Sequence, residues 1–205
     1  FAAVGFNIGF VSPWVAASLG VISGVVIGAI AEYYTSYDFK PTQMIAHASK
    51  EGPALTITQG LAVGMKSCMF PLIVLGVTTY VSYAVSGIFG IAMAAVGMLS
   101  FVSATVSVDT YGPISDNAGG IAEMSELEPE VRQITDKLDS VGNTTAAIGK
   151  GFAIGSAALA ALSLMVSFLY AFQPVGAELD LNFTDPKILA GALIGGALPF
   201  MFSGM

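Results

Sequence analysis

Charged side chains are scarce in this chain of 205 residues. Lys and Arg together number 7, Asp and Glu number 14, and only 10% of the residues are charged, whereas a soluble domain has about 25%. Hydrophobic residues make up 55% of the sequence, and the mean hydropathy is +0.78. This composition excludes an ordinary soluble domain and predicts a polytopic protein of the lipid bilayer. Because the sequence has no basic patch, it also argues against a nucleic-acid partner.

Cysteine and histidine occur only once each. Cys68 has no partner for an internal disulfide, and its position in an apolar run predicts a buried, inert thiol. Around His47 no cysteine, aspartate or second histidine stands at ligand spacing. The sequence therefore does not predict a zinc site there.

Apolar runs divide the chain. The first four are long enough to cross a bilayer as helices of about 20 residues, and the last is near the minimum. The predicted fold class is an all-α membrane protein with about five transmembrane helices, at residues 8–31, 55–80, 84–112, 143–172 and 187–205. The chain begins at Phe1 and stops at Met205 inside apolar runs, so we expect a fragment of a longer protein.

Positive charge gathers in alternate connections between these spans. Lys and Arg occur in 32–54 and 113–142, whereas 81–83 has no charge and 173–186 has no Lys or Arg. The positive-inside rule then predicts that 32–54 and 113–142 are cytoplasmic loops. Turn and proline signals predict a short surface helix within each of these two connections.

Small residues recur at four-residue spacing in the apolar runs, which lets helix backbones approach closely in a bilayer. We interpret the pattern as tight packing in a many-helix bundle rather than as a specific dimer motif. The residues concerned are Gly20, Gly24, Gly28, Gly60, Gly64, Gly151, Gly155, Gly191 and Gly195.

Polar residues at the ends of two spans carry the strongest functional signal. Asp109 and Asp116 are seven residues apart, as are Asn143 and Lys150, so each pair shares one helix face. Two adjacent helices would aim all four side chains into one crevice, although Pro113 is expected to weaken this geometry by kinking or ending its helix. Such groups are costly at membrane depth and usually mark a substrate or ion site.

Each of these residues also has a structural alternative. Asp116 lies in Ser-Asp-Asn, which is turn chemistry as well. Asn143 is equally suited to cap a helix, and Asp109 to a hydrogen bond inside the bundle. The acidic side chains between the two spans are interpreted as solvated loop charges, namely Glu123, Glu126, Glu128 and Glu130.

Two segments resemble the membrane-bound, ion-pumping pyrophosphatase family. They are DTYGPISDNAGGIAEM at 109–124 and TDKLDSVGNTTAAIGKGFAIGS at 135–156, and together they cover about a fifth of the chain. EYYTS from Glu32 and GLAVGMKS from Gly60 are similar too.

The resemblance implies one piece of a homodimeric pump with about sixteen transmembrane helices. Such a pump hydrolyses diphosphate with Mg²⁺ at the cytoplasmic face, here of an expected prokaryotic plasma membrane, and moves H⁺ or Na⁺. The resemblance implies that Asp116 is a catalytic Mg²⁺ ligand and that Asn143 binds metal or diphosphate; Asp109 and Lys150 are weaker candidates for the same region. Other groups needed for hydrolysis would lie outside this chain, so we expect residues 1–205 alone to be inactive.

Ala146 and Gly149 bear on potassium. In the family that the chain resembles, a lysine at the first position and a threonine at the second mark members that are independent of K⁺. A lysine ammonium can take the place of a bound K⁺ ion. The two small residues found here therefore imply a pump that K⁺ activates.

A different class of function is a secondary transporter for an anionic solute. Transporters also place their sites at broken helices and helix ends, such as those near Asp116 and Asn143. They show repeat symmetry between their halves, and this sequence shows none.

Overall fold

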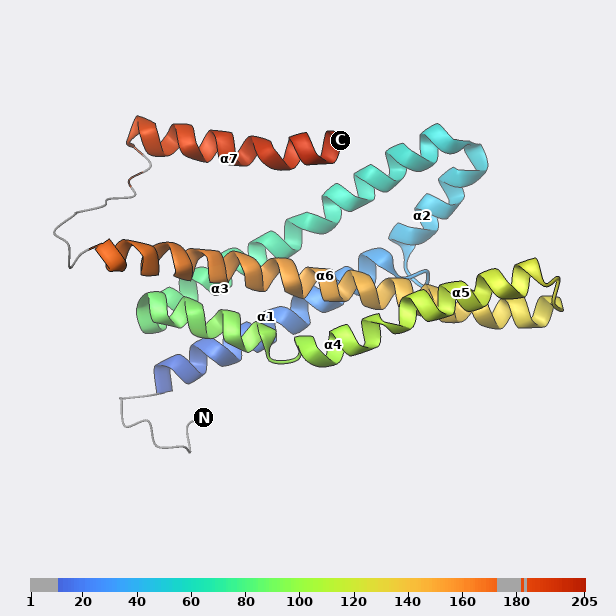
Figure 1. Ribbon diagram of the computed structural model, residues 1–205, viewed down its shortest axis with the longest axis horizontal. Coiled ribbons are helices and arrows are strands. Elements are labelled where there is room, and N and C mark those ends of the chain that lie inside the picture. The colour runs from blue at the N-terminus through green and yellow to red at the C-terminus, as the bar shows by residue number, and fades with distance from the viewer. Residues whose placement is uncertain (1–10, 173–181, 183) are drawn as a thin grey trace. The chain divides into compact units, whose positions relative to one another are not determined.

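The computed structural model describes residues 11–172, 182 and 184–205. Every regular element in these residues is helical, so the predicted all-α class is confirmed (Figure 1). The chain forms two compact units, Phe1–Ser163 and Leu164–Met205, which are described separately. The elements are α1 (Val11–Thr35), α2 (Lys40–Ala48), the 3-10 turn η1 (Ser49–Glu51), α3 (Pro53–Leu99), α4 (Val102–Asp109), α5 (Tyr111–Met124), α6 (Pro129–Phe172) and α7 (Pro186–Gly204).

The long helix α3 folds back on itself at Ser86 and Gly87. Ser86 has φ −145° and ψ 21°, and Gly87 has φ 61° and ψ −151°, so neither is helical. A Cβ atom on Gly90 would collide with the carbonyl oxygen of Ser82, which makes glycine necessary where the two arms meet. Residues 81–83, where a break was expected, are helical. The break comes later because the reversal requires the left-handed φ of Gly87.

Four helical stretches are long and apolar enough to cross a membrane, at Val11–Glu51, Pro53–Met124, Pro129–Ala171 and Pro186–Gly204. The second has 72 residues, far more than the roughly 20 that one crossing needs. Because it contains the reversal in α3, it is long enough to hold both the second and the third predicted span.

The connection expected at 113–142 is helical except at 125–128, because α5 continues to Met124 and α6 begins at Pro129. The 44 residues of α6 make a helix about 66 Å long, more than twice the roughly 30 Å of a hydrocarbon core. The polar first third of α6 therefore extends beyond the apolar part of the same helix, which is long enough by itself to cross a bilayer. Water hydrates polar side chains on two exposed helices as well as it hydrates those of a loop, so the polar sequence is compatible with helices. In 32–54, α2 is the short helix that was expected.

The core of the first unit lies where α1, the second arm of α3 and α6 meet. It is formed by Ile27, Ile91, Ala94, Ala95, Met98 and Leu159. Glycines make the approach close, since a Cβ atom on Gly20 would collide with the backbone of Ala94, and one on Gly97 with the backbone of Ala17.

Within the described residues, only some of the glycines at four-residue spacing lie at close contacts between helices. Close packing is confirmed at Gly20, Gly24, Gly28, Gly151 and Gly155, where an added Cβ atom would press on a neighbouring helix. At Gly60, Gly64, Gly191 and Gly195 an added Cβ atom would meet no other atom within 4 Å.

Cys68 lies on an exposed face of α3, so the predicted burial of its thiol is wrong for the described residues. Its neighbours Met65 and Met69 are exposed as well. This face of α3 is thus left uncovered by the rest of the described chain.

Candidate functional site

The helices α5 and α6 pair antiparallel with a constant register. A Cβ atom on Gly142 would lie 2.7 Å from the Cα atom of Gly112, which fixes the closest approach. Two further contacts continue the same register in opposite directions, between Gly119 and Thr135 and between Thr105 of α4 and Gly149. Each seven-residue step along α4 and α5 therefore matches a seven-residue step back along α6.

The helix is interrupted at Thr110, between the two aspartates of the predicted pair, although Thr110 itself keeps helical dihedral angles of φ −64° and ψ −19°. Pro113 has no N–H to donate to the carbonyl of Asp109, four residues earlier, and its ring crowds that carbonyl. It sits in the first turn of α5, where proline is tolerated. The interruption that was expected from Pro113 is therefore present. Asp109 lies at the end of α4, whereas Asp116 lies in α5.

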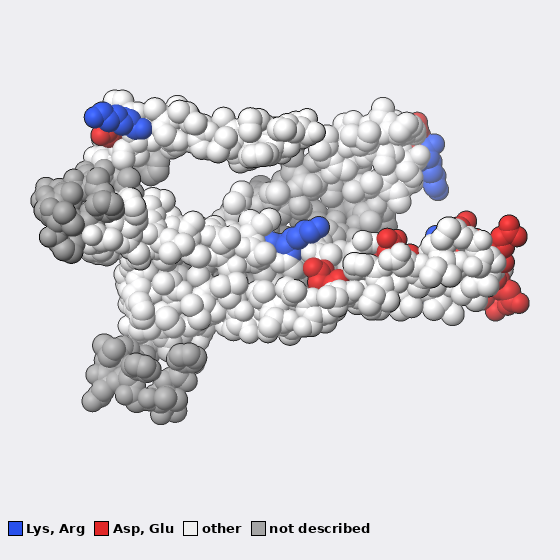
Figure 2. Space-filling view, in the orientation of Figure 1, with Lys and Arg blue, Asp and Glu red and all other residues white. Residues whose placement is uncertain are grey.

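A pocket of about 290 Å³ lies between α5 and the start of α6. Figure 2 shows acidic side chains gathered over this end of the two helices. The pocket is lined by Asp116, Gly119, Gly120, Glu123, Met124, Arg132, Asp136 and Asp139. Four carboxylates and one guanidinium leave the lining with a net charge of −3, which favours cations over free anions.

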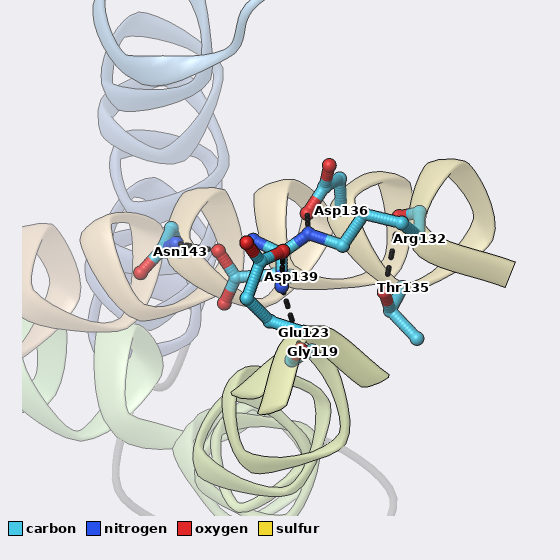
Figure 3. A network of polar contacts seen from close by, with 7 residues as sticks. All are labelled: Gly119, Glu123, Arg132, Thr135, Asp136, Asp139 and Asn143. Carbon is cyan, nitrogen blue, oxygen red and sulfur yellow. Dashed lines mark hydrogen bonds and ion pairs between the residues drawn. The ribbon is translucent and has the colours of Figure 1, made fainter. Parts of the chain in front are cut away.

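Arg132 joins the two helices across this pocket (Figure 3). Its Nη1 donates to the carbonyl oxygen of Gly119 at 2.6 Å and lies 3.4 Å from Oε2 of Glu123. Its Nε lies 2.9 Å from Oδ1 of Asp136, one turn along α6. The guanidinium of Arg132, a residue of α6, therefore links the two helices through its contacts with Gly119 and Glu123 of α5.

Asn143 is connected to the pocket through Asp139. The Nδ2 of Asn143 donates to Oδ2 of Asp139 at 3.0 Å, which leaves the amide oxygen of Asn143 as an acceptor. Asn143 lies well inside α6, so the alternative that it caps a helix is wrong. The two residues together offer carboxylate and amide oxygens on one side of α6.

The oxygen donors of this pocket suit a hard cation such as Mg²⁺. In the part of the chain that the structure describes, no three His, Cys, Asp or Glu side chains are grouped closely enough to hold a metal ion. The four carboxylates of the lining include the one or two that a protein usually gives to Mg²⁺, whose other ligands are phosphate oxygens and water.

The other predicted site residues lie closer to the apolar part of α6. Ala146 and Gly149 are half-buried, and Lys150 is exposed and outside the pocket lining. Asp109 is half-buried at the end of α4. Its Oδ1 atom is buried and has no hydrogen-bond partner among the described residues. The structure therefore places Asp116 in the pocket lining and connects Asn143 to the lining through Asp139, whereas Lys150 lies outside it.

Sequence reasoning missed Arg132, Asp136 and Asp139 as site residues. It placed Glu123 in a loop, whereas this exposed side chain lies on α5 and pairs with Arg132. A signal was available, because the seven-residue spacing from Asp109 to Asp116 continues to Glu123. The same spacing links Arg132, Asp139 and Ala146 on the facing helix.

Comparison with known proteins places the chain in a family. The model of the family described as inorganic H⁺ pyrophosphatase matches residues 2–205. A K(+)-stimulated pyrophosphate-energized sodium pump from Thermotoga maritima is 53% identical over 98% of this chain and 29% of its own length. A putative pump of the same description from Clostridium tetani is 52% identical over 96% of this chain and 30% of its own length. A K(+)-insensitive pyrophosphate-energized proton pump from Methanosarcina mazei is 43% identical over 91% of this chain and 29% of its own length.

The match extends over nearly the whole chain, well beyond the two polar segments. The chain spans about 30% of the length of these curated relatives. Together with its long apolar helices, the match makes it part of an integral membrane protein. The chain belongs to the inorganic H⁺ pyrophosphatase family.

Proposed function

We propose that this chain is part of a membrane-bound inorganic diphosphatase that couples hydrolysis of magnesium diphosphate to transport of Na⁺ or H⁺. The observation that carries the proposal is the acidic pocket between α5 and α6, at the polar end of helices that are otherwise apolar. A net charge of −3 in its lining repels free diphosphate and attracts the Mg²⁺ ions that accompany it.

Asp116 and Asn143 hold magnesium in this proposal. Asp116 is exposed into the pocket and contributes a carboxylate oxygen. Asp139 orients Asn143 through the 3.0 Å hydrogen bond, so that the amide oxygen points away from Asp139. Bound Mg²⁺ would neutralise phosphate charge and lower the pKa of an attacking water. Asp109 and Lys150 remain weaker candidates for the same region.

Ala146 and Gly149 make the pump K⁺-stimulated in this proposal. Both are small and half-buried, and Gly149 packs against Thr105 of α4, so neither residue carries the long cationic side chain that would take the place of K⁺. The relatives at 53% and 52% identity are named as K⁺-stimulated, and the K⁺-insensitive relative is less similar, at 43%.

The pocket faces the cytoplasm of a prokaryotic plasma membrane in this proposal, and the full-length protein is a homodimer. Arg132 and Lys137 lie on the pocket end of α6, and positive charge near span ends favours the cytoplasmic side. The relatives come from bacteria and an archaeon.

Inside-out vesicles that contain the full-length protein test this function. Magnesium diphosphate is supplied outside the vesicles with and without K⁺, and phosphate release, Na⁺ uptake and lumenal pH are followed. We expect hydrolysis that rises with K⁺ and is accompanied by Na⁺ uptake or by acidification. If the vesicles take up a solute but hydrolyse no diphosphate in any of these ion conditions, the proposal is overturned and the secondary transporter is favoured.

A further inference from the structure

The first arm of α3, which precedes the reversal, carries a single charged side chain, Lys66. Lys66 stands near the middle of the apolar run at 55–80, about 15 Å or more from either end of it. A helix of this length crosses the bilayer once, so the ammonium group lies at membrane depth. A cation there is costly, and it almost always faces other parts of the protein or a water-filled cavity.

Lys66 lies on a face of α3 that the described residues leave largely uncovered. Gln59, Lys66 and Ile73 are spaced by seven residues, so they lie on one line along the helix. We call this line, with Phe70 and Val77 beside it, the Lys66 face. The side chains of Phe70, Ile73 and Val77 are 45%, 56% and 56% exposed, and Lys66 is exposed as well.

The two polar groups of the Lys66 face have no partner in the part of the chain that the structure describes. Neither the ammonium of Lys66 nor the side-chain amide of Gln59 takes part in an ion pair or a hydrogen bond there. In membrane proteins charged side chains pair with one another or with backbone carbonyl oxygens, and side-chain amides hydrogen-bond across helix interfaces. Two such groups, two turns apart on one helix, indicate a neighbouring helix rather than lipid.

The apolar runs of residues 1–205 offer no mid-span acidic partner for Lys66. They contain one acidic residue, Asp109, which stands at the end of α4. A second copy of these runs lacks a mid-span carboxylate in the same way. The chain spans about 30% of the length of its curated relatives, so most of the full-length polypeptide remains to supply one.

We propose that the Lys66 face is covered by a transmembrane helix of the same polypeptide from outside residues 1–205, and that this helix carries an Asp or Glu opposite Lys66. The exposed apolar side chains beside Lys66 match a helix that is otherwise apolar. The ion pair and a hydrogen bond to Gln59, two turns away, fix the position of this helix along α3. The proposal goes beyond the diphosphatase function and does not depend on it.

Photo-cross-linking in the full-length protein tests what covers this face. Ile73 is replaced by p-benzoylphenylalanine, which leaves Lys66 in place, and membranes that contain the protein are irradiated. The matched control carries the same group at Leu72, which is 65% exposed on another side of α3. We expect the label at residue 73 to give a product of monomer mass, joined to a peptide from outside residues 1–205. That peptide should hold an Asp or Glu about two helical turns from the cross-link. The label at residue 72 should not give this peptide.

Thermal melting of the full-length protein in detergent tests the charge. Lys66→Met should lower the melting temperature by at least about 2 °C, because it leaves the partner carboxylate unpaired at membrane depth. Lys66→Arg keeps the charge and should stay close to the wild type. Neutralising the acidic residue that the cross-link identifies, by Asp→Asn or Glu→Gln, should restore most of the loss in Lys66→Met. The matched control is Lys50→Met, which removes an exposed cation of η1 and should not change melting.

Two sets of results would overturn the proposal. One is a cross-link from residue 73 that joins lipid alone, a second copy or another part of residues 1–205, or the absence of any product. The other is a melting temperature of Lys66→Met equal to or above that of the wild type, because a lysine that faces lipid gains stability when its charge is removed. Both sets leave the proposed diphosphatase function intact, since hydrolysis is measured separately.

Discussion

Replacing Arg132 by alanine should loosen the polar end of the α5–α6 hairpin. The substitution removes the hydrogen bond to the Gly119 carbonyl at 2.6 Å and the ion pairs to Glu123 at 3.4 Å and Asp136 at 2.9 Å. It also leaves four carboxylates in the pocket lining with no positive side chain among them.

The size of the effect follows from the exposure of the partners. The Arg132 side chain is 39% exposed, and those of Glu123 and Asp136 are 70% and 57% exposed. Exposed ion pairs contribute about 0.2–1 kcal/mol each, whereas a hydrogen bond from a charged donor contributes about 1.5–3 kcal/mol. The bond to Gly119 therefore dominates, and the local free energy of opening should fall by about 3 kcal/mol.

Hydrogen exchange in the full-length protein measures this quantity directly. A loss of about 3 kcal/mol speeds exchange of the backbone amides at the hairpin end about 100-fold, if they exchange by local opening. Arg132→Lys keeps the charge but not the planar fork, and should lie between the wild type and the alanine variant. Lys137→Ala is the matched control, because Lys137 is an exposed cation of α6 outside the pocket lining. Exchange of Arg132→Ala within twofold of that control would refute the reasoning.

Four further outcomes are expected. In the full-length protein, Asp116→Asn should raise the Mg²⁺ concentration for half-maximal hydrolysis by about tenfold or more, since a carboxylate ligand is lost; an unchanged Mg²⁺ dependence would contradict the role of Asp116. Gly142→Ala should destabilise the protein by about 1–3 kcal/mol in thermal melts, because its Cβ atom would lie 2.7 Å from Gly112. Gly120→Ala, whose Cβ atom would meet nothing within 4 Å, should not, and equal melting temperatures would count against the close approach. Glu126 has φ 52°, so Glu126→Gly should stabilise the turn by about 0.5–1 kcal/mol, and a lower melting temperature would oppose this account. Residues 1–205 alone should release no phosphate from magnesium diphosphate, and measurable release would show that the missing part of the protein is dispensable.

The helices were predictable because long apolar runs leave few other structures for a membrane chain. The position of the reversal in α3 was not, because hydropathy carries no information on backbone dihedral angles. Only the φ of 61° at Gly87 and the contact between Gly90 and Ser82 locate it. Residues 113–142 were expected to form a cytoplasmic connection with one short helix because they are polar. They belong to two long helices instead, because a helix can be polar on its solvated faces.

The pocket was predictable only in part. Asp116 and Asn143 stand out by residue type at the ends of apolar runs, and the structure brings Asp116 to the pocket lining. Arg132 and Asp139 did not stand out, because their role depends on which residues of α6 face α5. That register is set by the contact of Gly112 with Gly142, and two glycines in separate helices give no sign in the sequence that they touch.

The break at Thr110 has a mechanical consequence for the hairpin. On one side, Asp109 and Asp116 are carried by two segments that join at this point. On the other side, Gly142 and Gly149, which contact Gly112 of α5 and Thr105 of α4, are carried by the single uninterrupted helix α6. A bend at Thr110 would therefore change the distance between the two aspartates, while the distance between Gly142 and Gly149 on α6 would stay fixed. Any change in the spacing of these two carboxylates would thus act at one backbone position.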